Sequence, residues 1–159
     1  MGNLSYGTMK NCYSQADANG EGAVGSLIGH HYYSVTTNSW SSGNASGHYG
    51  IGGLLGENVY STASDCYATG IVDGIEETGG LIGYNRGDLL NSYSAGRVTG
   101  TYYVGGLVGT SYIDGMVSNC YSTSSVIGDE WVGGLLGFND GVVVHCYSVG
   151  DVTGTFKDY

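Results

Sequence analysis

Apolar residues recur along the chain at four fixed positions of a unit about 27 residues long. Valine, isoleucine, alanine, methionine and threonine fill most copies of three positions, and the fourth is always leucine, at Leu27, Leu54, Leu81, Leu107 and Leu135. A sequence period of about 20 to 50 residues is typical of one structural unit stacked on itself. The pattern therefore predicts a solenoid in which these positions form columns that line the interior.

Within each copy the apolar positions fall on short segments bounded by glycine. In one copy we expect strands over residues 116–123, 125–127 and 132–136. Nothing in the sequence keeps the roughly 3.6-residue apolar spacing of a helix. Three short strands with three turns are typical of one rung, meaning one full turn, of a parallel β-helix. We therefore expect an all-β, single-domain β-helix over residues 1–159 with about six rungs, right-handed by the general preference of parallel crossovers.

A polar residue followed by a small–aromatic–small tripeptide marks another part of each copy, as in Asn119-Cys120-Tyr121-Ser122. We expect the polar side chains to line a corner and hydrogen-bond between rungs, and the rings to stack. The polar position holds Asn11, Asn38, Asp65, Asn91, Asn119 and His145. The aromatic position holds Tyr13, Trp40, Tyr67, Tyr93, Tyr121 and Tyr147.

The cysteines share the position between the polar and the aromatic residue: Cys12, Cys66, Cys120 and Cys146, with Ser39 and Ser92 in the other copies. Serine in the same position indicates that a small buried side chain is needed there, rather than a bridge. Only Cys120 and Cys146 would be neighbours in a stack, so a disulfide between them is the alternative.

Charge limits the classes of partner. The formal net charge is -10, with four Lys and Arg against fourteen Asp and Glu. Such a field repels nucleic acid and anionic membranes. No apolar run approaches the roughly 18 residues of a membrane span, and no signal peptide is visible. We therefore expect neither a nucleic-acid partner nor membrane insertion.

The repeated block Val-Gly-Gly-Leu-Val/Ile/Leu-Gly, followed by Asn-Cys-Tyr-Ser, resembles the GLUG motif repeats of bacterial surface proteins. The clearest copies are Val104–Gly109 with Asn119–Thr123, and Val132–Gly137 with Cys146–Gly150. Such repeats occur in immunoglobulin A-specific metallopeptidases and in adhesins of the filamentous haemagglutinin type. The resemblance covers nearly the whole chain and implies an extracellular, cell-surface stalk or adhesive module, an excised or open-ended part of a longer solenoid. It does not imply peptidase activity, because the zinc-binding His-Glu-x-x-His is missing from the sequence.

Metal and cofactor sites are not expected. His30 and His31, with Glu57 one rung further on, come closest to a set of metal ligands. Adjacent side chains on a strand point to opposite faces, however, which disfavours a shared metal ion.

Two adjacent acid pairs, Glu76-Glu77 and Asp129-Glu130, are the candidates for catalysis. Polysaccharide hydrolases use paired carboxyl groups, and parallel β-helices host such enzymes. Both pairs fall on a segment that we expect to be a solvated turn. We therefore expect no enzyme activity, with a polysaccharide-active enzyme as the alternative.

The segment before the glycine block varies between copies and collects aromatic and acidic residues. Stacked in register, these residues would form one edge ladder that suits a glycan or the basic groups of a protein. The alternative is that the rings only cover the edge of the coil. The candidate binding residues are Tyr49, Glu76, Tyr102, Glu130 and Phe156, with Tyr103 and Trp131 beside them.

The sequence thus favours a non-catalytic structural or adhesive module of an exported bacterial protein. Its expected partners are flanking solenoid repeats, identical copies end to end, or a host glycan or protein. The alternative is the protomer of an extracellular filament, because both ends of such a coil would present unpaired strand edges.

Overall fold

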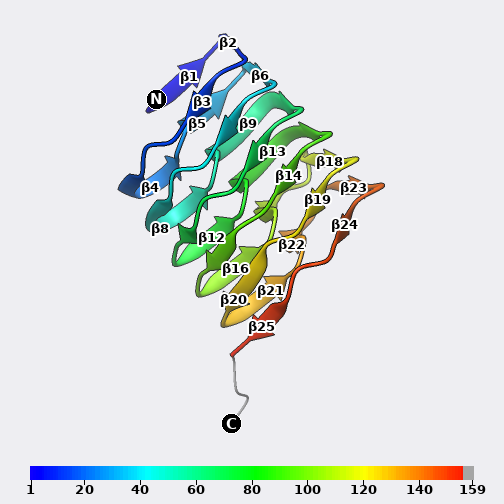
Figure 1. Ribbon diagram of the computed structural model, residues 1–159. Coiled ribbons are helices and arrows are strands. Elements are labelled where there is room, and N and C mark those ends of the chain that lie inside the picture. Colours follow the sequence, from blue (N-terminus) through cyan, green and yellow to red (C-terminus); the bar gives the residue numbers. More distant parts are fainter. Residues whose placement is uncertain (156–159) are drawn as a thin grey trace.

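The computed structural model describes residues 1–155, which form a parallel β-solenoid (Figure 1). Equivalent strands of successive rungs pair in parallel, as Tyr67 does with Trp40 and Tyr93. The predicted fold class and repeat length are confirmed, whereas the handedness stays a prediction. No helix of the described chain is long and apolar enough to cross a membrane.

Within residues 1–155 the strands form three sheets that run along the coil. Sheet A has ten strands: β1 (Asn3–Ser5), β2 (Thr8–Lys10), β5 (Ile28–Tyr32), β6 (Val35–Thr37), β9 (Leu55–Ser64), β13 (Ile82–Leu90), β17 (Val108–Ser111), β18 (Met116–Ser118), β22 (Leu136–Asn139) and β23 (Val142–Val144). Sheet B has six: β3 (Tyr13–Ser14), β7 (Trp40–Ser41), β10 (Tyr67–Ala68), β14 (Tyr93–Ser94), β19 (Tyr121–Ser122) and β24 (Tyr147–Ser148). Sheet C has nine: β4 (Ala18–Gly25), β8 (Ala45–Gly52), β11 (Val72–Asp73), β12 (Glu76–Gly79), β15 (Arg97–Thr99), β16 (Tyr102–Gly105), β20 (Ser125–Gly128), β21 (Glu130–Gly133) and β25 (Val152–Gly154).

Two of the expected strands are divided by corners. The strand expected over 116–123 is split at Asn119, where the chain passes from β18 in sheet A to β19 in sheet B. The strand expected over 132–136 is split between β21 and β22, so the glycine block forms a corner. The apolar residues of that block point inward from the corner. Hydrophobicity alone could not distinguish such a corner from a strand.

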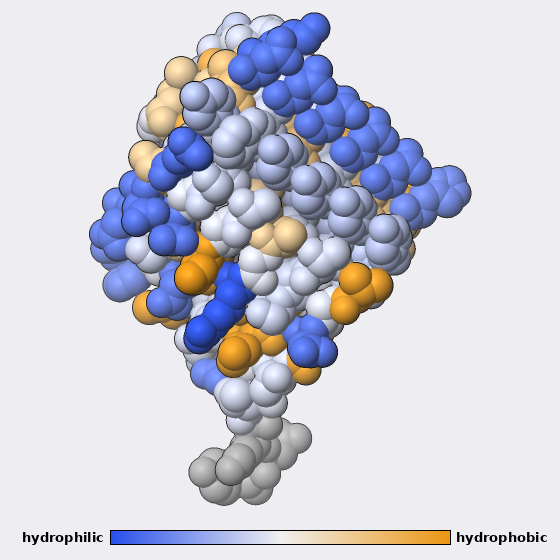
Figure 2. Space-filling model, in the orientation of Figure 1, coloured by the Kyte–Doolittle hydropathy of each residue, from blue (hydrophilic) through white to orange (hydrophobic). Residues whose placement is uncertain are grey.

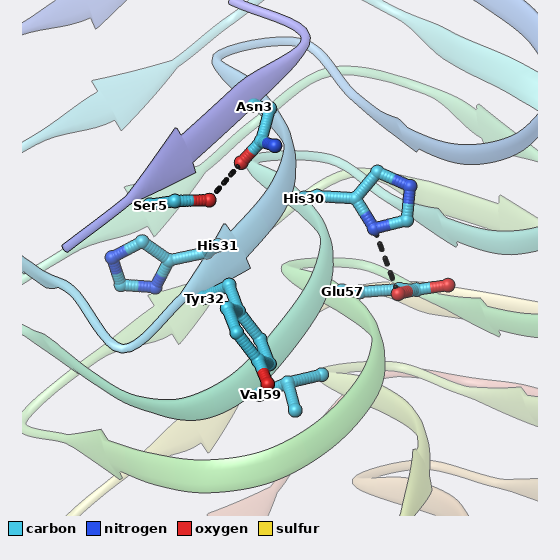
Figure 3. Close-up of a pocket in the computed structure, with 7 residues that line it drawn as sticks. All are labelled: Asn3, Ser5, His30, His31, Tyr32, Glu57 and Val59. Atoms are coloured by element: carbon cyan, nitrogen blue, oxygen red, sulfur yellow. Dashed lines mark hydrogen bonds and ion pairs between the residues drawn. The ribbon is translucent and has the colours of Figure 1, made fainter.

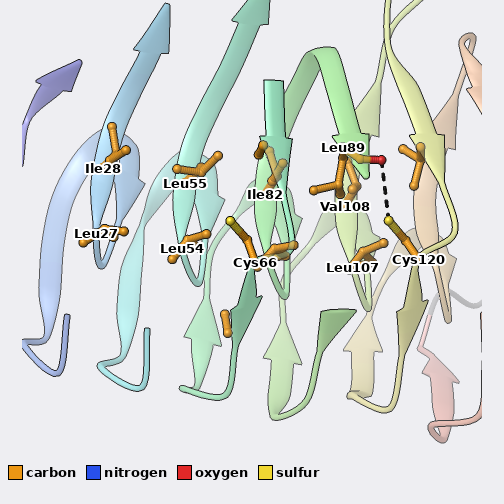
Figure 4. Packing of buried hydrophobic residues seen from close by; sticks show 14 of the residues in the cluster. Leu27, Ile28, Leu54, Leu55, Cys66, Ile82, Leu89, Leu107, Val108 and Cys120 are labelled. Carbon is orange, nitrogen blue, oxygen red and sulfur yellow. Dashed lines mark hydrogen bonds between the residues drawn. The ribbon is translucent and has the colours of Figure 1, made fainter. Parts of the chain in front are cut away.

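The expected apolar columns form the core. Leu54, Leu81 and Leu107 are fully buried, and Leu135 of the last rung packs partly buried against them. The residue after each leucine is also buried at Ile28, Leu55, Ile82 and Val108 and partly buried at Leu136, and Figure 4 shows such pairs repeating from rung to rung. Because each buried aliphatic side chain contributes about 1.5–3 kcal/mol, the columns are the main source of stability.

The glycines of the block bring two backbones into direct contact where sheet C turns into sheet A. A Cβ atom at Gly79 would overlap the carbonyl oxygen of Ile82 and lie 2.5 Å from the nitrogen of Gly109. A Cβ atom at Gly83 would overlap backbone atoms of Gly50 in the preceding rung. Equivalent glycines make the same contacts in neighbouring rungs. The block is therefore a narrow neck that only glycine can fill at these two positions.

The polar column occupies a left-handed corner, with φ between 48° and 56° from Asn11 to His145. Asparagine and aspartate adopt this conformation more readily than other non-glycine residues. Among residues 1–155, the column makes one side-chain hydrogen bond between rungs, from Asn91 Nδ2 to Asp65 Oδ1 at 3.4 Å. The expected ladder of side-chain hydrogen bonds is therefore wrong, and the backbone conformation explains the column.

Side chains of the cysteine and serine column accept hydrogen bonds from backbone N–H groups at this corner. The Cys66 N–H donates to Ser92 Oγ at 3.0 Å, and the Ser92 N–H donates to Cys120 Sγ at 3.4 Å. All four cysteines are free thiols, so the alternative Cys120–Cys146 disulfide is not formed. Burial raises the pKa of the Cys120 thiol to about 12. These thiols therefore act as small hydrogen-bonding side chains.

The aromatic column stacks as expected along the outside of sheet B. From Tyr13 to Tyr147, successive ring centroids lie 4.8, 5.7, 4.9, 4.9 and 5.2 Å apart, with planes within 8° of parallel. Each such pair contributes about 0.5–1.5 kcal/mol beyond burial. The space-filling view shows side chains of similar hydropathy in oblique rows that cross the rungs (Figure 2).

A buried column of polar side chains, which was missed from the sequence, lies on the inner face of sheet A. His31 Nδ1 lies 2.8 Å from Asn58 Oδ1, and Asn58 Nδ2 donates to Asn85 Oδ1 at 2.8 Å. Because Asn58 uses its amide group on Asn85, its oxygen is the acceptor, which places the His31 proton on Nδ1. His31 Nε2 then accepts from the Thr36 hydroxyl at 3.1 Å. Both imidazole nitrogens of the neutral side chain are thus satisfied.

The neck predicts that alanine substitution destabilises the protein strongly at one glycine and hardly at another. We expect Gly79→Ala to lower the free energy of unfolding by about 2 kcal/mol or more, because the backbone must shift to admit the methyl group. Gly2→Ala is the matched control, since a Cβ atom there meets nothing within 4 Å. Urea unfolding of both variants checks this, and equal stability of the two would contradict the neck.

His31 predicts a pH dependence of stability. Burial lowers its pKa below the usual 6.5, although the hydrogen bond with Asn58 opposes the shift. The unfolded chain therefore binds the proton more readily, so stability is lost as the pH falls below about 6.5. We expect the parent to lose more stability between about pH 7.5 and about pH 5.5 than His31→Asn, which keeps a donor for Asn58. Identical pH profiles from chemical denaturation would contradict the prediction.

Candidate functional site

Four of the expected binding residues stack in register at the outer end of sheet C. Glu76 pairs with Tyr49 on one side and with Tyr102 on the other, and Tyr102 pairs with Glu130. Their strands are β8, β12, β16 and β21. Phe156, the fifth residue expected in this ladder, lies outside the described residues. We call Tyr49, Glu76, Tyr102, Tyr103, Glu130 and Trp131 the binding edge.

The next residue in each rung forms a second left-handed corner. Gly50, Glu77, Tyr103 and Trp131 have φ of 63°, 53°, 54° and 57°. Bulky side chains rarely adopt this conformation, which costs a non-glycine residue about 1–2 kcal/mol. Gly50 shows that the fold accepts glycine here. The rings of Tyr103 and Trp131 are therefore not required by the backbone.

The aromatic residues of the binding edge gather near its last rungs. The ring of Trp131 is centred 6.1 Å from that of Tyr103, and Phe138 of β22 lies 5.8 Å from Tyr103. Phe138 also meets Trp131 edge-on at 6.1 Å. Trp131 nevertheless stays 58% exposed. Phe138 was missed from the sequence, although it directly follows the last glycine of its block.

The two adjacent acids Glu76 and Glu77 have different surroundings. Glu76 is exposed in the ladder, whereas Glu77 is half-buried in the corner. Burial, together with the nearby charges of Glu76 and Glu57, raises the pKa of Glu77 to about 7. The binding edge therefore carries an acidic potential that no Lys or Arg of the edge itself offsets.

The adjacent histidines point to opposite faces, as the sequence predicted. His30 points outward and its Nδ1 lies 2.9 Å from Glu57 Oε2, whereas His31 turns into the coil (Figure 3). No group of three or more His, Cys, Asp or Glu side chains among residues 1–155 could hold a metal ion.

A third left-handed corner, on the sheet A side, carries tyrosines that the sequence reasoning missed. Tyr6, Tyr33 and Tyr60 have φ of 52°, 44° and 50°. Their rings stack with centroids 5.3 and 5.2 Å apart, and all three are exposed. The signal was their 27-residue spacing, which ends at Gly87, where the corner is one residue shorter.

Comparisons with known proteins agree with this geometry. The family model of the GLUG motif matches residues 47–73 and 100–127. A solved structure from Bacteroides ovatus, of a protein provisionally assigned as an immunoglobulin A1 protease, aligns with a TM-score of 0.66 and 25% sequence identity. The alignment covers 90% of this chain and 49% of that one, so the chain spans about half the length of that protein. No curated protein shows a significant match.

Both motif matches cover the same part of the repeat. Each begins in or just before a strand of sheet C, crosses the neck and continues through sheets A and B. They therefore include the glycines that make the backbone contacts and the corner that precedes the stacked ring. The expected resemblance is confirmed, because two segments of this β-solenoid, residues 47–73 and 100–127, match the GLUG motif.

Proposed function

We propose that this structural repeat module is adhesive, and that it binds a glycan along the binding edge as part of an exported protein at a bacterial surface. The solenoid supplies a rigid support, because every rung is hydrogen-bonded to its neighbours. The localisation rests on the GLUG repeats and on the likeness to the Bacteroides protein.

The observation that carries the proposal is the exposure of Trp131 beside Tyr103. Both residues hold left-handed conformations. Gly50 occupies the same position without strain, two rungs before Tyr103 and three rungs before Trp131. Exposed ring faces bind the apolar face of a sugar, and the neighbouring carboxylate of Glu130 can accept its hydroxyl groups. The rings are thus explained by a ligand better than by the fold.

We also propose that the module performs no catalysis. A glycosidase places two carboxyl groups on opposite sides of the scissile bond. Here the acids follow one another along an outer edge, in the order of the rungs. Shortened products released from a bound glycan would contradict this part of the proposal.

A second role, end-to-end stacking with flanking repeats or a second copy, is favoured by the last rung. Val126 is 1% exposed, whereas Val152, its partner in the next rung, is 46% exposed. Within residues 1–155, the outer edge of β25 pairs with no further strand, beside this apolar column. Sedimentation at rising concentration checks the version with a second copy. A strict monomer at high concentration would contradict filament formation.

Loss of the rings predicts loss of glycan binding. On a glycan array we expect the parent to bind selectively, and Trp131→Ala and Tyr102→Ala each to weaken binding about tenfold, or roughly 1.4 kcal/mol. Tyr13→Ala is the control, because it removes from sheet B a ring about as exposed as that of Trp131. No selective binding by the parent would eliminate the glycan proposal.

A further inference from the structure

Four exposed tyrosines form one continuous surface on the early rungs of sheet A. Tyr6, Tyr33 and Tyr60 stack at the third corner, and Tyr32 meets Tyr33 nearly at right angles, with ring centroids 4.5 Å apart. Tyr6 is 77% exposed. Three of these residues hold left-handed conformations, so the backbone gives no reason for aromatic side chains there.

This surface already holds one guanidinium group of the chain itself. Arg86 lies with Cζ 5.1 Å from the centre of the Tyr60 ring. Its Nη2 donates to Asp114 Oδ2 at 2.6 Å. A cation over an aromatic face is attracted by the ring quadrupole, and a carboxylate adds a charged hydrogen bond. The molecule thus contains a complete set of ring, guanidinium and carboxylate.

A neighbouring hollow has an aromatic ring, Tyr32, and a carboxylate, Glu57, but no guanidinium or ammonium group in its lining. It has a volume of about 330 Å³, and besides the inward-pointing His31 its lining residues are Asn3, Ser5, His30, Tyr32, Glu57 and Val59. These residues form two adjacent outward columns of β1, β5 and β9. Figure 3 shows His30 and Glu57 on one side of the hollow, with Tyr32 and Val59 on another.

Glu57 has capacity for a further partner. Its Oε2 takes the hydrogen bond from His30, and within residues 1–155 its Oε1 makes none. The lining contains no Lys or Arg. Arg86 follows Val59 in the same column, but its guanidinium is paired with Asp114. A planar guanidinium can stack on a ring and donate to a carboxylate at the same time.

The surrounding charge favours a cation over an anion or a neutral group. The chain carries a formal charge of -10. Glu57 lies close enough to Glu77 to contribute to the raised pKa of that carboxyl group, together with Glu76. Such a field concentrates basic partners and speeds their association.

We propose that the hollow between Tyr32 and Glu57 binds an arginine side chain of a basic protein segment, with its guanidinium stacked on Tyr32 and paired with Glu57. The tyrosines of the third corner extend the contact surface for the rest of the segment. This site lies on sheet A and uses no residue of the binding edge, so it adds a protein partner to the proposed glycan.

The test uses isothermal titration calorimetry with a blocked Gly-Arg-Gly-Arg-Gly peptide and its Lys and Gln counterparts. We expect the Arg peptide to bind most tightly and the Gln peptide not to bind, with affinity falling as salt rises from about 0.05 to about 0.5 M. Tyr32→Ala and Glu57→Gln should each weaken binding about tenfold. Tyr32→Phe, which keeps the ring, should stay within about threefold of the parent.

Two controls separate this site from the others. Tyr13→Ala removes an exposed ring from sheet B, and Trp131→Ala removes one from the binding edge; both should bind the Arg peptide like the parent. No binding of the Arg peptide up to about 10 mM, or equal binding by Tyr32→Ala, would overturn the proposal. A neutral oligosaccharide whose binding is lost in Tyr32→Ala would show a glycan site there instead.

Discussion

Every feature of this molecule depends on parallel backbone pairing between equivalent residues of successive rungs. The pairing joins like to like, so leucine packs on leucine, ring stacks on ring, and an amide donates to the amide of the next rung. Because parallel strands lie about 4.8 Å apart, a column of rings gains stacking at close to its optimal separation. A side chain that suits one rung is thereby also suited to the next, which explains why one short sequence unit can specify the whole fold.

The corners are where this regular pairing has an energetic cost. At the neck, Gly79 and Gly83 permit backbone contact that any side chain would block. At the other corners, non-glycine residues adopt left-handed conformations, and asparagine tolerates them best. Tyrosine or tryptophan at such a corner has a higher conformational cost than glycine or asparagine, and the backbone does not require an aromatic side chain there. Both proposed binding surfaces include residues of this kind, Trp131 on the binding edge and Tyr33 on sheet A.

The columns could be predicted from the sequence because spacing alone defines them. The stacking of Tyr49, Glu76 and Tyr102 followed from their equal positions in the repeat, and the opposite directions of His30 and His31 followed from strand geometry. The corner at Gly134 and Leu135 could not be recognised, since an inward-pointing leucine has the same pattern in a corner and in a strand. The role of the polar column depended on φ, which residue identity indicates only indirectly.

The missed residues had signals that the repeat partly concealed. His31, Asn58 and Asn85 occupy one position of the unit, but the change from histidine to asparagine hid their common role as a buried ladder. The tyrosines at 6, 33 and 60 are separated by one repeat, yet the shorter corner at Gly87 interrupts the series. The direction of a side chain at an irregular corner depends on the local backbone conformation, which the repeat spacing does not determine.

In-register stacking is tested most directly by the distance between labels at the two ends of the aromatic column. Spin labels at Tyr13 and Tyr147, in a chain whose four cysteines are replaced by serine, are separated by five strand spacings. Serine already fills the same column at Ser39 and Ser92, so the replacement suits the fold. Double electron–electron resonance should give one narrow distribution near about 24 Å. A broad distribution, or a separation far from this value, would contradict the stacking of equivalent residues.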